Sequence, residues 1–248
     1  MLNGKESPVD LRTLREQVYG DLRRALMNAK FAPGQKVTIR SLASALGTSL
    51  TPVREALRRL IAEGALEGEA NRSVRVPIMT RDKILELRDI RLALEGLAAA
   101  RAAERISREE IAHLRSLSLE IVAARDRGDT ATDIAKVTEF QFAVYRAAEM
   151  PALLKLIEMV WVQTGPYVNL LFPNYVKSKR SEWRARLCKA LEARRPELAQ
   201  REVETDISEV VAYIASLADE TGRIHPRPSD VPHPARRRSR TRVRLAHE

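Results

Sequence analysis

Apolar residues recur at helical spacing through most of this 248-residue chain, and this periodicity limits its fold to packed helices. After Thr80 every periodic segment is helical, and no alternating strand pattern appears. Pro151, Pro173 and Pro196 mark breaks between segments. The expected helices run from about Arg81 past Leu97, from Ser107 to Gly128, and over 130–149, 152–170, 178–194 and 197–219. The sequence therefore predicts a mainly α fold, with an all-helical bundle of about six helices over residues 80–220.

The N-terminal part of the chain combines helical segments with a short β pattern. An apolar stripe over residues 11–26 predicts a first helix. A second, short helix can be capped by Thr38 and ended by Gly47. A third amphipathic helix follows, and two short apolar runs around a polar bend at 70–73 then indicate a two-stranded wing. Three helices and a hairpin predict a winged helix-turn-helix over residues 1–79.

The formal net charge of +10 is concentrated at the two ends of the chain. Residues 1–79 hold 13 Lys and Arg against 8 Asp and Glu, residues 80–225 hold 23 of each, and residues 226–248 hold 7 Arg against 2 acids. A basic excess confined to one domain is typical of a protein that binds a polyanion such as DNA. Residues 221–248 are rich in Pro and Arg without an apolar stripe, which predicts a basic disordered tail. This tail is either a solvated end or a source of extra non-specific DNA affinity.

Other classes of protein find little support in the sequence. No window is apolar over the ~18 residues that a membrane span requires, and the N-terminus lacks an apolar signal core. We therefore expect a cytoplasmic protein with no membrane partner. The single Cys188 excludes an internal disulfide framework. Because there is no Gly-rich phosphate loop, paired-Cys metal pattern or Ser/His/Asp arrangement, we do not expect an enzyme.

The predicted third helix, which begins near Ser49, carries a basic face opposite its apolar stripe. In a helix-turn-helix the second helix enters the major groove, where residues near its start reach base edges and flanking cations meet phosphates. For any one arginine alone a solvated position is the simpler interpretation, but the whole set on one template favours DNA. Arg59 is expected to continue this face. The candidate DNA-binding residues are Arg40, Ser49, Leu50, Thr51, Arg54 and Arg58, with Arg72 and Arg75 on the wing.

The stretch FAPGQKVTIRSLASALGTSLTPVREALRRLIAEGAL resembles the winged helix of the GntR family of bacterial regulators. It keeps the family's Pro-Gly turn, its leucine-alanine helix and most of the pattern G-V-S-R-T-P-V-R-E-A-L-R-R-L. The resemblance implies DNA contacts by Arg40, Ser49, Thr51 and Arg54.

Two positions depart from the GntR pattern. Leu50 replaces the usual arginine between Ser and Thr, and Ser73 stands where the wing tip usually has glycine. Leu50 lacks a guanidinium of the kind that reads guanine, which is worth roughly 1–3 kcal/mol of discrimination. We therefore expect binding through phosphates with a shifted base preference, in which Leu50 contacts a thymine methyl or only packs on the turn.

Residues 80–220 resemble the FCD-type effector domain of the FadR-like branch of the same family. The matches lie in LRDIRLALEGLAAARAA, FQFAVYRAAEMPALL and SEWRARLCKALEARRPELAQREVETDI. The resemblance implies a homodimer that binds a palindromic double-stranded operator and a small-molecule effector that alters DNA affinity. We expect a ligand-responsive bacterial transcriptional repressor, relieved by a small organic acid or related metabolite. The alternative is a non-specific architectural nucleic-acid-binding protein without an effector.

Many FCD-type domains hold a divalent metal with one Asp and three His, and this sequence departs from that pattern. The Asp position falls on Val137, and the His positions fall on Gln141, Arg184 and Asp206. Valine has no lone pair and arginine has no acceptor. We therefore expect neither a metal nor another cofactor.

The same positions can instead form a metal-free polar pocket. A guanidinium can bind a carboxylate without the help of a metal. The alternative is a relic cavity filled by a salt bridge between Arg184 and Asp206, with Arg91 paired to Glu95 along its helix and the aromatic residues in the core. The candidate effector-binding residues are Arg91, Gln141, Tyr145, Trp161, Tyr167, Arg184 and Asp206.

Overall fold

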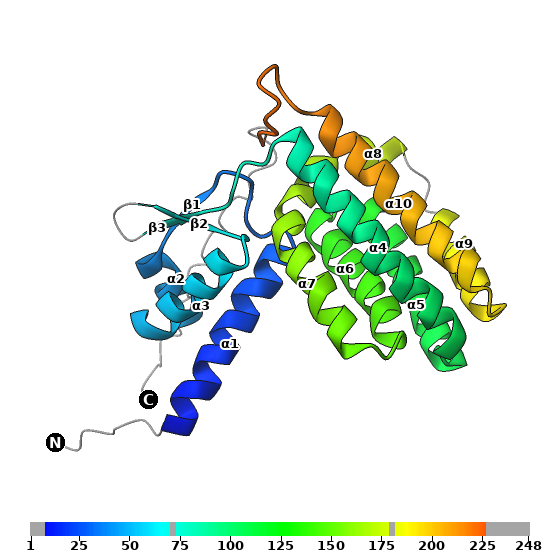
Figure 1. The fold of residues 1–248 in the computed structure, drawn as a ribbon, viewed down its shortest axis with the longest axis horizontal. Coiled ribbons are helices and arrows are strands. Elements are labelled where there is room, and N and C mark those ends of the chain that lie inside the picture. Colours follow the sequence, from blue (N-terminus) through cyan, green and yellow to red (C-terminus); the bar gives the residue numbers. More distant parts are fainter. Residues whose placement is uncertain (1–7, 70–72, 179–181, 227–248) are drawn as a thin grey trace, which may run out of the picture.

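The computed structural model describes residues 8–69, 73–178 and 182–226. Its elements form an N-terminal group and a C-terminal helical group, which meet where α1 lies against α7 (Figure 1). In chain order the elements are α1 (Pro8–Met27), β1 (Lys36–Thr38), α2 (Ile39–Leu46), α3 (Leu50–Ala62), β2 (Glu67–Glu69), β3 (Ser73–Arg75), α4 (Arg81–Arg105), α5 (Arg108–Asp126), α6 (Thr130–Ala147), α7 (Pro151–Thr164), the 3₁₀ helix η1 (Gly165–Leu171), α8 (Asn174–Ser178), α9 (Glu182–Glu192) and α10 (Pro196–Ser216). The predicted mainly α fold is confirmed.

The helix-turn-helix consists of α2 and α3, and α1 packs against α3. Thr38 caps α2 as predicted, because its Oγ1 accepts a hydrogen bond from the Ser41 amide at 3.1 Å. Gly47 ends α2 with a φ of 64°, a left-handed conformation that glycine adopts at little cost. The apolar stripe of α3 is buried, and Val53 and Leu60 are fully enclosed. This core decides which face of α3 stays exposed.

The sheet of the N-terminal group has three strands in the order β1-β3-β2, all antiparallel, where the sequence predicted two. The extra strand β1 pairs Val37 with Val74. Three residues are too few to show a period of two, so the pattern missed this strand. The β-branched Val37 and Thr38 were its only local signal.

The C-terminal group is a helical bundle in which the long α4 packs mainly against α10 and also contacts α6 and α7. At the start of α5 the predicted capping box is present. Ser107 Oγ accepts from the Glu110 amide at 3.1 Å, and Glu110 Oε2 accepts from the Ser107 amide at 2.7 Å. Among the helices that the structure describes, none combines the length and apolarity needed to cross a bilayer. The predicted all-helical bundle is confirmed.

The helix predicted over 152–170 does not continue to its expected end. It stops at Thr164, and η1 follows, because Pro166 has no amide hydrogen and its ring clashes with the carbonyl of the preceding turn. Gly165 lies so close to the end of α1 that a Cβ added to it would sit 2.6 Å from the Leu26 carbonyl oxygen. In the region predicted as one helix over 178–194, the structure describes the short α8 and then α9, and residues 179–181 lie outside the described residues.

The segment after α10 is ordered further than the sequence suggested. Disorder was expected from Thr221 onward, but the backbone of residues 222–224 pairs with residues 79–81. We call residues 77–80, which join the two groups of elements, the linker. Gly222 O accepts from the Arg81 amide at 2.8 Å, and the Ile224 amide donates to Met79 O at 3.0 Å. Ile224 is fully buried. We call residues 219–224 the strap, and the remaining tail, 227–248, lies outside the described residues.

Candidate DNA-binding face and effector cavity

The start of α3 presents the predicted DNA-binding residues to solvent. Arg40, Ser49, Thr51 and Arg54 are all exposed. Ser49 occupies the N-cap position of α3, but its side chain makes no capping hydrogen bond. Leu50 is 36% exposed, so its side chain is accessible from solvent. Ser49, Leu50, Thr51 and Arg54 are therefore accessible at the start of α3, and Arg40 is accessible on α2.

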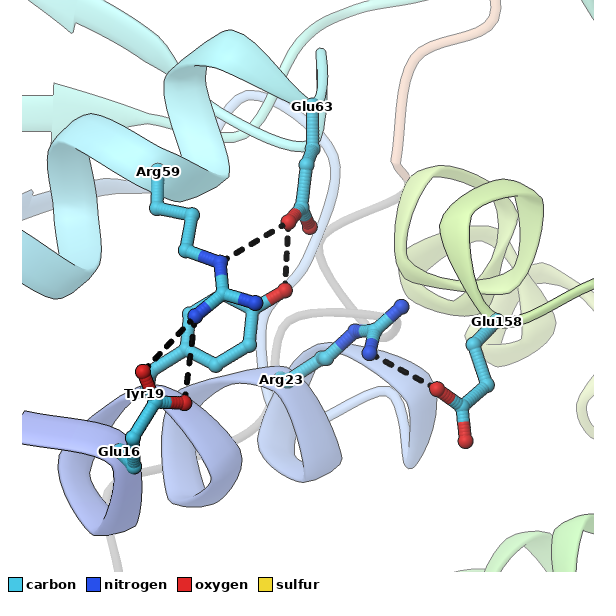
Figure 2. Close-up of polar contacts among 6 residues, drawn as sticks. All are labelled: Glu16, Tyr19, Arg23, Arg59, Glu63 and Glu158. Atoms are coloured by element: carbon cyan, nitrogen blue, oxygen red, sulfur yellow. Dashed lines mark hydrogen bonds and ion pairs between the residues drawn. The ribbon is translucent and has the colours of Figure 1, made fainter. Parts of the chain in front are cut away.

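The two arginines that follow on α3 point to different places. Arg58 is exposed and only loosely paired with Glu55, at 3.5 Å. Arg59 instead turns toward α1, where its guanidinium lies 3.7 Å from the centre of the Tyr19 ring and 3.2 Å from Glu16 (Figure 2). The Arg59 side chain remains 50% exposed, but it is engaged with α1, so its part in the basic face stays a prediction. Its position one residue along the helix places it against α1.

The wing residues are less accessible than the sequence suggested. Arg75 forms an ion pair with Glu69, and Glu69 also binds Lys36 at 2.9 Å. A contact between Arg75 and DNA would require its guanidinium to leave this pair. Arg72 lies outside the described residues. The DNA role of both arginines stays a prediction.

The C-terminal bundle contains a partly open cavity of about 60 Å³ between α5, α6, η1, α8, α9 and α10. Four charged side chains reach it: Arg125, Asp133, Arg184 and Asp206. Most of the remaining wall is apolar and includes Ile134, Val137, Val168, Leu171, Phe172 and Val210. A mostly apolar cavity with a few polar groups is the usual form of a small-molecule site.

Arg184 is the feature of the cavity that most needs an explanation. Its residue is only 3% exposed, and among the described residues its Nε and Nη1 have no hydrogen-bond partner. Burial, and then the nearby Arg125 charge, lower the pKa of Arg184 to about 10, so the guanidinium still carries its charge at neutral pH. A buried cation with unsatisfied donors is costly unless an anion or a polar group meets it.

Two other charged residues of the cavity, Arg125 and Asp133, form an ion pair with each other. Arg125, near the end of α5, reaches Asp133 in the first turn of α6, with Nε 2.8 Å from Oδ2 and Nη2 3.4 Å from Oδ1. Asp133 is fully buried. Neither residue was among the effector-binding residues predicted from the sequence. Asp133 is in helical phase with Val137 and Phe140, and an acid in an apolar stripe was the signal that could have revealed it.

The predicted effector-binding residues divide into separate groups. Arg184 and Asp206 line the cavity. Arg91, Gln141, Tyr145 and Trp161 lie instead around the buried Glu95, and Tyr167 belongs to neither group. A single pocket that contains all seven residues is therefore not what the structure describes, and their role as effector ligands stays a prediction.

In the group around Glu95, the polar side chains of Arg91, Gln141 and Tyr145 bind one another or Glu95, whereas Trp161 Nε1 has no hydrogen-bond partner among the described residues. Arg91 Nε donates to Glu95 Oε1 at 2.6 Å, and the Tyr145 hydroxyl donates to Oε2 at 2.5 Å. The Gln141 amide oxygen lies 2.9 Å from the same hydroxyl, and the Arg91 guanidinium lies 5.1 Å from the Trp161 ring centre. Burial raises the pKa of Tyr145 well above its usual value. These contacts support the alternative in which Arg91 pairs with Glu95 along its helix and does not bind a ligand.

Tyr167 holds the linker between the two groups of elements. Its Oη accepts a hydrogen bond from the Met79 amide at 2.5 Å and donates to Pro77 O at 3.1 Å. Burial is the main cause of the raised pKa of this phenol. These contacts place the Tyr167 hydroxyl at residues 77–79 and away from the residues that line the cavity.

The residues present do not fit the metal site of related domains. Val137 lines the cavity without a donor atom, and Arg184 brings a positive charge into it. Gln141 lies in the other group, and Asp133 is already engaged with Arg125. Across the described ranges, no three His, Cys, Asp or Glu side chains converge as metal ligands would.

Comparison with protein families gives two matches that together span most of the chain. Residues 14–76 match the model of bacterial regulatory proteins of the gntR family. Residues 86–209 match the FCD domain. The resemblance inferred from the sequence is thereby confirmed.

Individual relatives agree with this assignment. The HTH-type transcriptional regulator McbR of Escherichia coli is 34% identical over 64% of this chain and 72% of its own length. A probable D-xylose utilization operon transcriptional repressor of Paenarthrobacter nicotinovorans is 29% identical over 86% of this chain and 92% of its own.

Solved structures give the same result. The structure of E. coli McbR/YncC matches with a TM-score of 0.73 and 31% identity, covering 81% of this chain and 96% of that one. A putative GntR regulator from Rhodococcus sp. RHA1 shares the fold, with a TM-score of 0.65 and 24% identity over 83% of this chain and 99% of that one. The chain therefore belongs to the GntR family of bacterial regulatory proteins, carries an FCD domain, and is a transcriptional regulator.

Proposed function

We propose that this protein is a homodimeric repressor that releases its operator when a small organic anion binds beside Arg184. The observation that carries the proposal is the buried guanidinium with two nitrogens that lack hydrogen-bond partners among the described residues. An anion in the cavity would accept hydrogen bonds from these nitrogens and offset the cost of burying the charge. One relative, of 29% identity, is named as a repressor, which supports this direction of control.

The size and lining of the cavity narrow the chemistry of the ligand. A volume of about 60 Å³ corresponds to roughly four water molecules, because each needs about 15 Å³ of such space. Apart from the four charged side chains of Arg125, Asp133, Arg184 and Asp206, the wall is mainly aliphatic, with Val168, Leu171 and Val210 among it. The ligand class proposed here is a short-chain monocarboxylate with an apolar body, such as propionate or butyrate.

The proposed DNA contacts use the exposed edge at the start of α3. Arg54 would reach base edges, with Ser49, Thr51 and Arg40 on bases or neighbouring phosphates. Leu50, 36% exposed, would replace the usual arginine–guanine contact with an apolar one. In a dimer the two copies of α3 would bind palindromic half-sites about one DNA turn apart.

Homodimer formation is supported by apolar side chains on the outside of α4. Ile90 and Leu97 are each 39% exposed and lie seven residues apart, on one face of the helix. Sedimentation velocity tests this proposal with Leu97→Glu, which should shift the dimer toward monomer at micromolar concentration. Ser116→Glu, at an exposed position of α5, is the control for the added charge.

The ligand proposal can be tested by thermal unfolding and DNA binding in parallel. Acetate, propionate, butyrate and inorganic phosphate would be titrated into wild type and into Arg184→Met. We expect propionate or butyrate to raise the Tm of the wild type and weaken its binding to promoter DNA, with neither effect in Arg184→Met. Lys189→Met removes a charge from the exposed side of the same helix and should respond like the wild type.

Two outcomes would overturn the ligand proposal. One is an equal response in Arg184→Met and the wild type. The other is stabilisation by a divalent metal that a chelator reverses. A gel-shift series with promoter DNA, random DNA and RNA separates the proposal from an architectural nucleic-acid-binding protein, which would bind all three similarly.

A further inference from the structure

The 3₁₀ helix η1 lies between the effector cavity and the DNA-binding unit. Val168 and Leu171 form part of the cavity wall. Gly165, Tyr167 and Asn169, which alternate with them, contact the N-terminal group instead. A single short segment of chain therefore touches both regions.

On the side of the DNA-binding unit, η1 is fitted to the end of α1. The Asn169 side chain donates to Ala29 O at 2.8 Å, and Ala29 holds a φ of 52°, an uncommon conformation for a residue other than glycine. At Gly165 an added Cβ would lie 2.7 Å from Met27 Cα, so the two backbones touch directly. Contacts of this kind leave little room for η1 to move without moving the end of α1.

The linker is held by the C-terminal domain from two directions. Tyr167, on η1, contacts the Met79 amide and Pro77 O. The strap contacts Met79 O through the Ile224 amide. The linker is therefore attached to the domain that contains the cavity.

Side-chain contacts join α1 to α3. Arg59 of α3 stacks on Tyr19, and the Tyr19 hydroxyl donates to Glu63 at 2.5 Å (Figure 2). Arg23, also on α1, reaches Glu158 on α7 at 2.8 Å. These contacts join α3 to α1, and α1 to the helix that leads into η1.

We propose that η1 couples the cavity to the DNA-binding unit: an occupant of the cavity displaces Val168 and Leu171, and Asn169 and Tyr167 transmit this shift to α1 and the linker. The proposal rests on the proposed function, because the natural occupant is the effector. A short 3₁₀ segment suits this role, because its hydrogen bonds are poorer than those of an α-helix and it rearranges at lower cost. Asn169 and Tyr167 are positioning residues that touch neither DNA nor ligand.

The first experiment measures coupling with butyrate as the probe. Butyrate affinity is measured by calorimetry, and operator affinity by fluorescence anisotropy with and without butyrate, for wild type, Asn169→Ala and Asn28→Ala. Asn28 also donates to a backbone carbonyl in the last turn of α1, but to Arg24 O within the same helix. It is therefore a matched control.

The expected result is a loss of coupling without a loss of binding. If butyrate weakens operator binding of the wild type by about tenfold, within the usual range of allosteric coupling, the factor should fall below about threefold in Asn169→Ala. Asn28→Ala should keep the wild-type factor. Tyr167→Phe should act like Asn169→Ala. Equal coupling in all four proteins would overturn the proposal.

A second experiment does not depend on any ligand. Val210→Phe, from α10, fills the cavity with a tethered ring, and Val137→Phe does so from α6. Either substitution should weaken operator binding, and the effect should shrink in the Asn169→Ala background, as a double-mutant cycle detects. An equal effect in both backgrounds, or no effect in folded protein, overturns the role of η1. A failure of butyrate to bind the wild type overturns only the ligand class.

Discussion

Arginine side chains occupy opposite surroundings in the DNA-binding face and in the effector cavity. Arg54 and Arg58 on α3 are exposed and remain hydrated until DNA replaces the water. Arg184 is 3% exposed and keeps two nitrogens without partners among the described residues. The exposed cations cost little in the free protein, whereas the buried one imposes a cost that a bound anion would relieve. The two proposed ligands, DNA and a small anion, would therefore gain their binding energy by different physical means.

The largest expected effect comes from breaking the buried ion pair of the cavity. Asp133→Ala leaves Arg125 without its partner, so we expect the free energy of unfolding to fall by about 3–5 kcal/mol. Urea denaturation followed by circular dichroism measures this change. Glu55→Ala breaks the exposed pair with Arg58 and should cost less than ~1 kcal/mol. Similar decreases in the two variants would contradict the contrast between the regions.

Removal of the unsatisfied cation should stabilise the protein. In Arg184→Met an apolar side chain of similar length replaces the buried guanidinium, so the free energy of unfolding should rise by about 1–3 kcal/mol. The same urea titration, without added ligand, measures the gain. A clear destabilisation would mean that Arg184 is already satisfied within the protein.

On the DNA-binding face, an arginine substitution should affect binding and not stability. Arg54→Ala is expected to weaken operator binding by about 1–3 kcal/mol, or five- to 150-fold, with an unchanged Tm. Anisotropy titrations and thermal unfolding give the two values. Arg59→Ala is the contrasting variant, because removing its interactions with Tyr19 and Glu16 should lower the Tm.

Leu50 tests whether the exposed edge of α3 reads bases. Leu50→Arg restores the family's usual residue and should create a preference of about tenfold for guanine at one position of each half-site. Selection of binding sites from random DNA, followed by sequencing, compares the two proteins. Identical base preferences would show that Leu50 only packs on the turn.

The smallest effect is expected from the basic tail. Truncation after Pro226 keeps the buried Ile224 and removes the seven arginines of residues 227–248. If the tail binds phosphates, the slope of log K against log salt should become shallower by about one for each phosphate that the truncated protein no longer neutralises. A full-length variant with these arginines changed to glutamine controls for chain length, and an unchanged slope in both would reject a DNA role.

Local signals identified the framework of the fold but not the composition of the cavity. The caps at Thr38 and Ser107 and the apolar stripe of α3 depend on residues within four positions of each other, so the sequence displays them directly. The pair between Arg125 and Asp133 joins two helices, and neither residue has a local feature that names the other. The predicted pocket was split for the same reason: helical phase shows that Gln141 and Tyr145 point inward, but not which interior space they face.

The sequence by itself determined where most helices begin and end, that the chain has a helix-turn-helix followed by a helical bundle, and which family its residues match. Only the tertiary structure decided what each charged side chain meets. Arg58 and Arg59 are neighbours in the chain, yet one faces solvent and the other lies on Tyr19. Arg184 and Asp206 lie on different helices, yet both line the same cavity. These outcomes depend on helices far apart in the sequence, because the energy of a charge depends on the groups and the water that packing leaves around it.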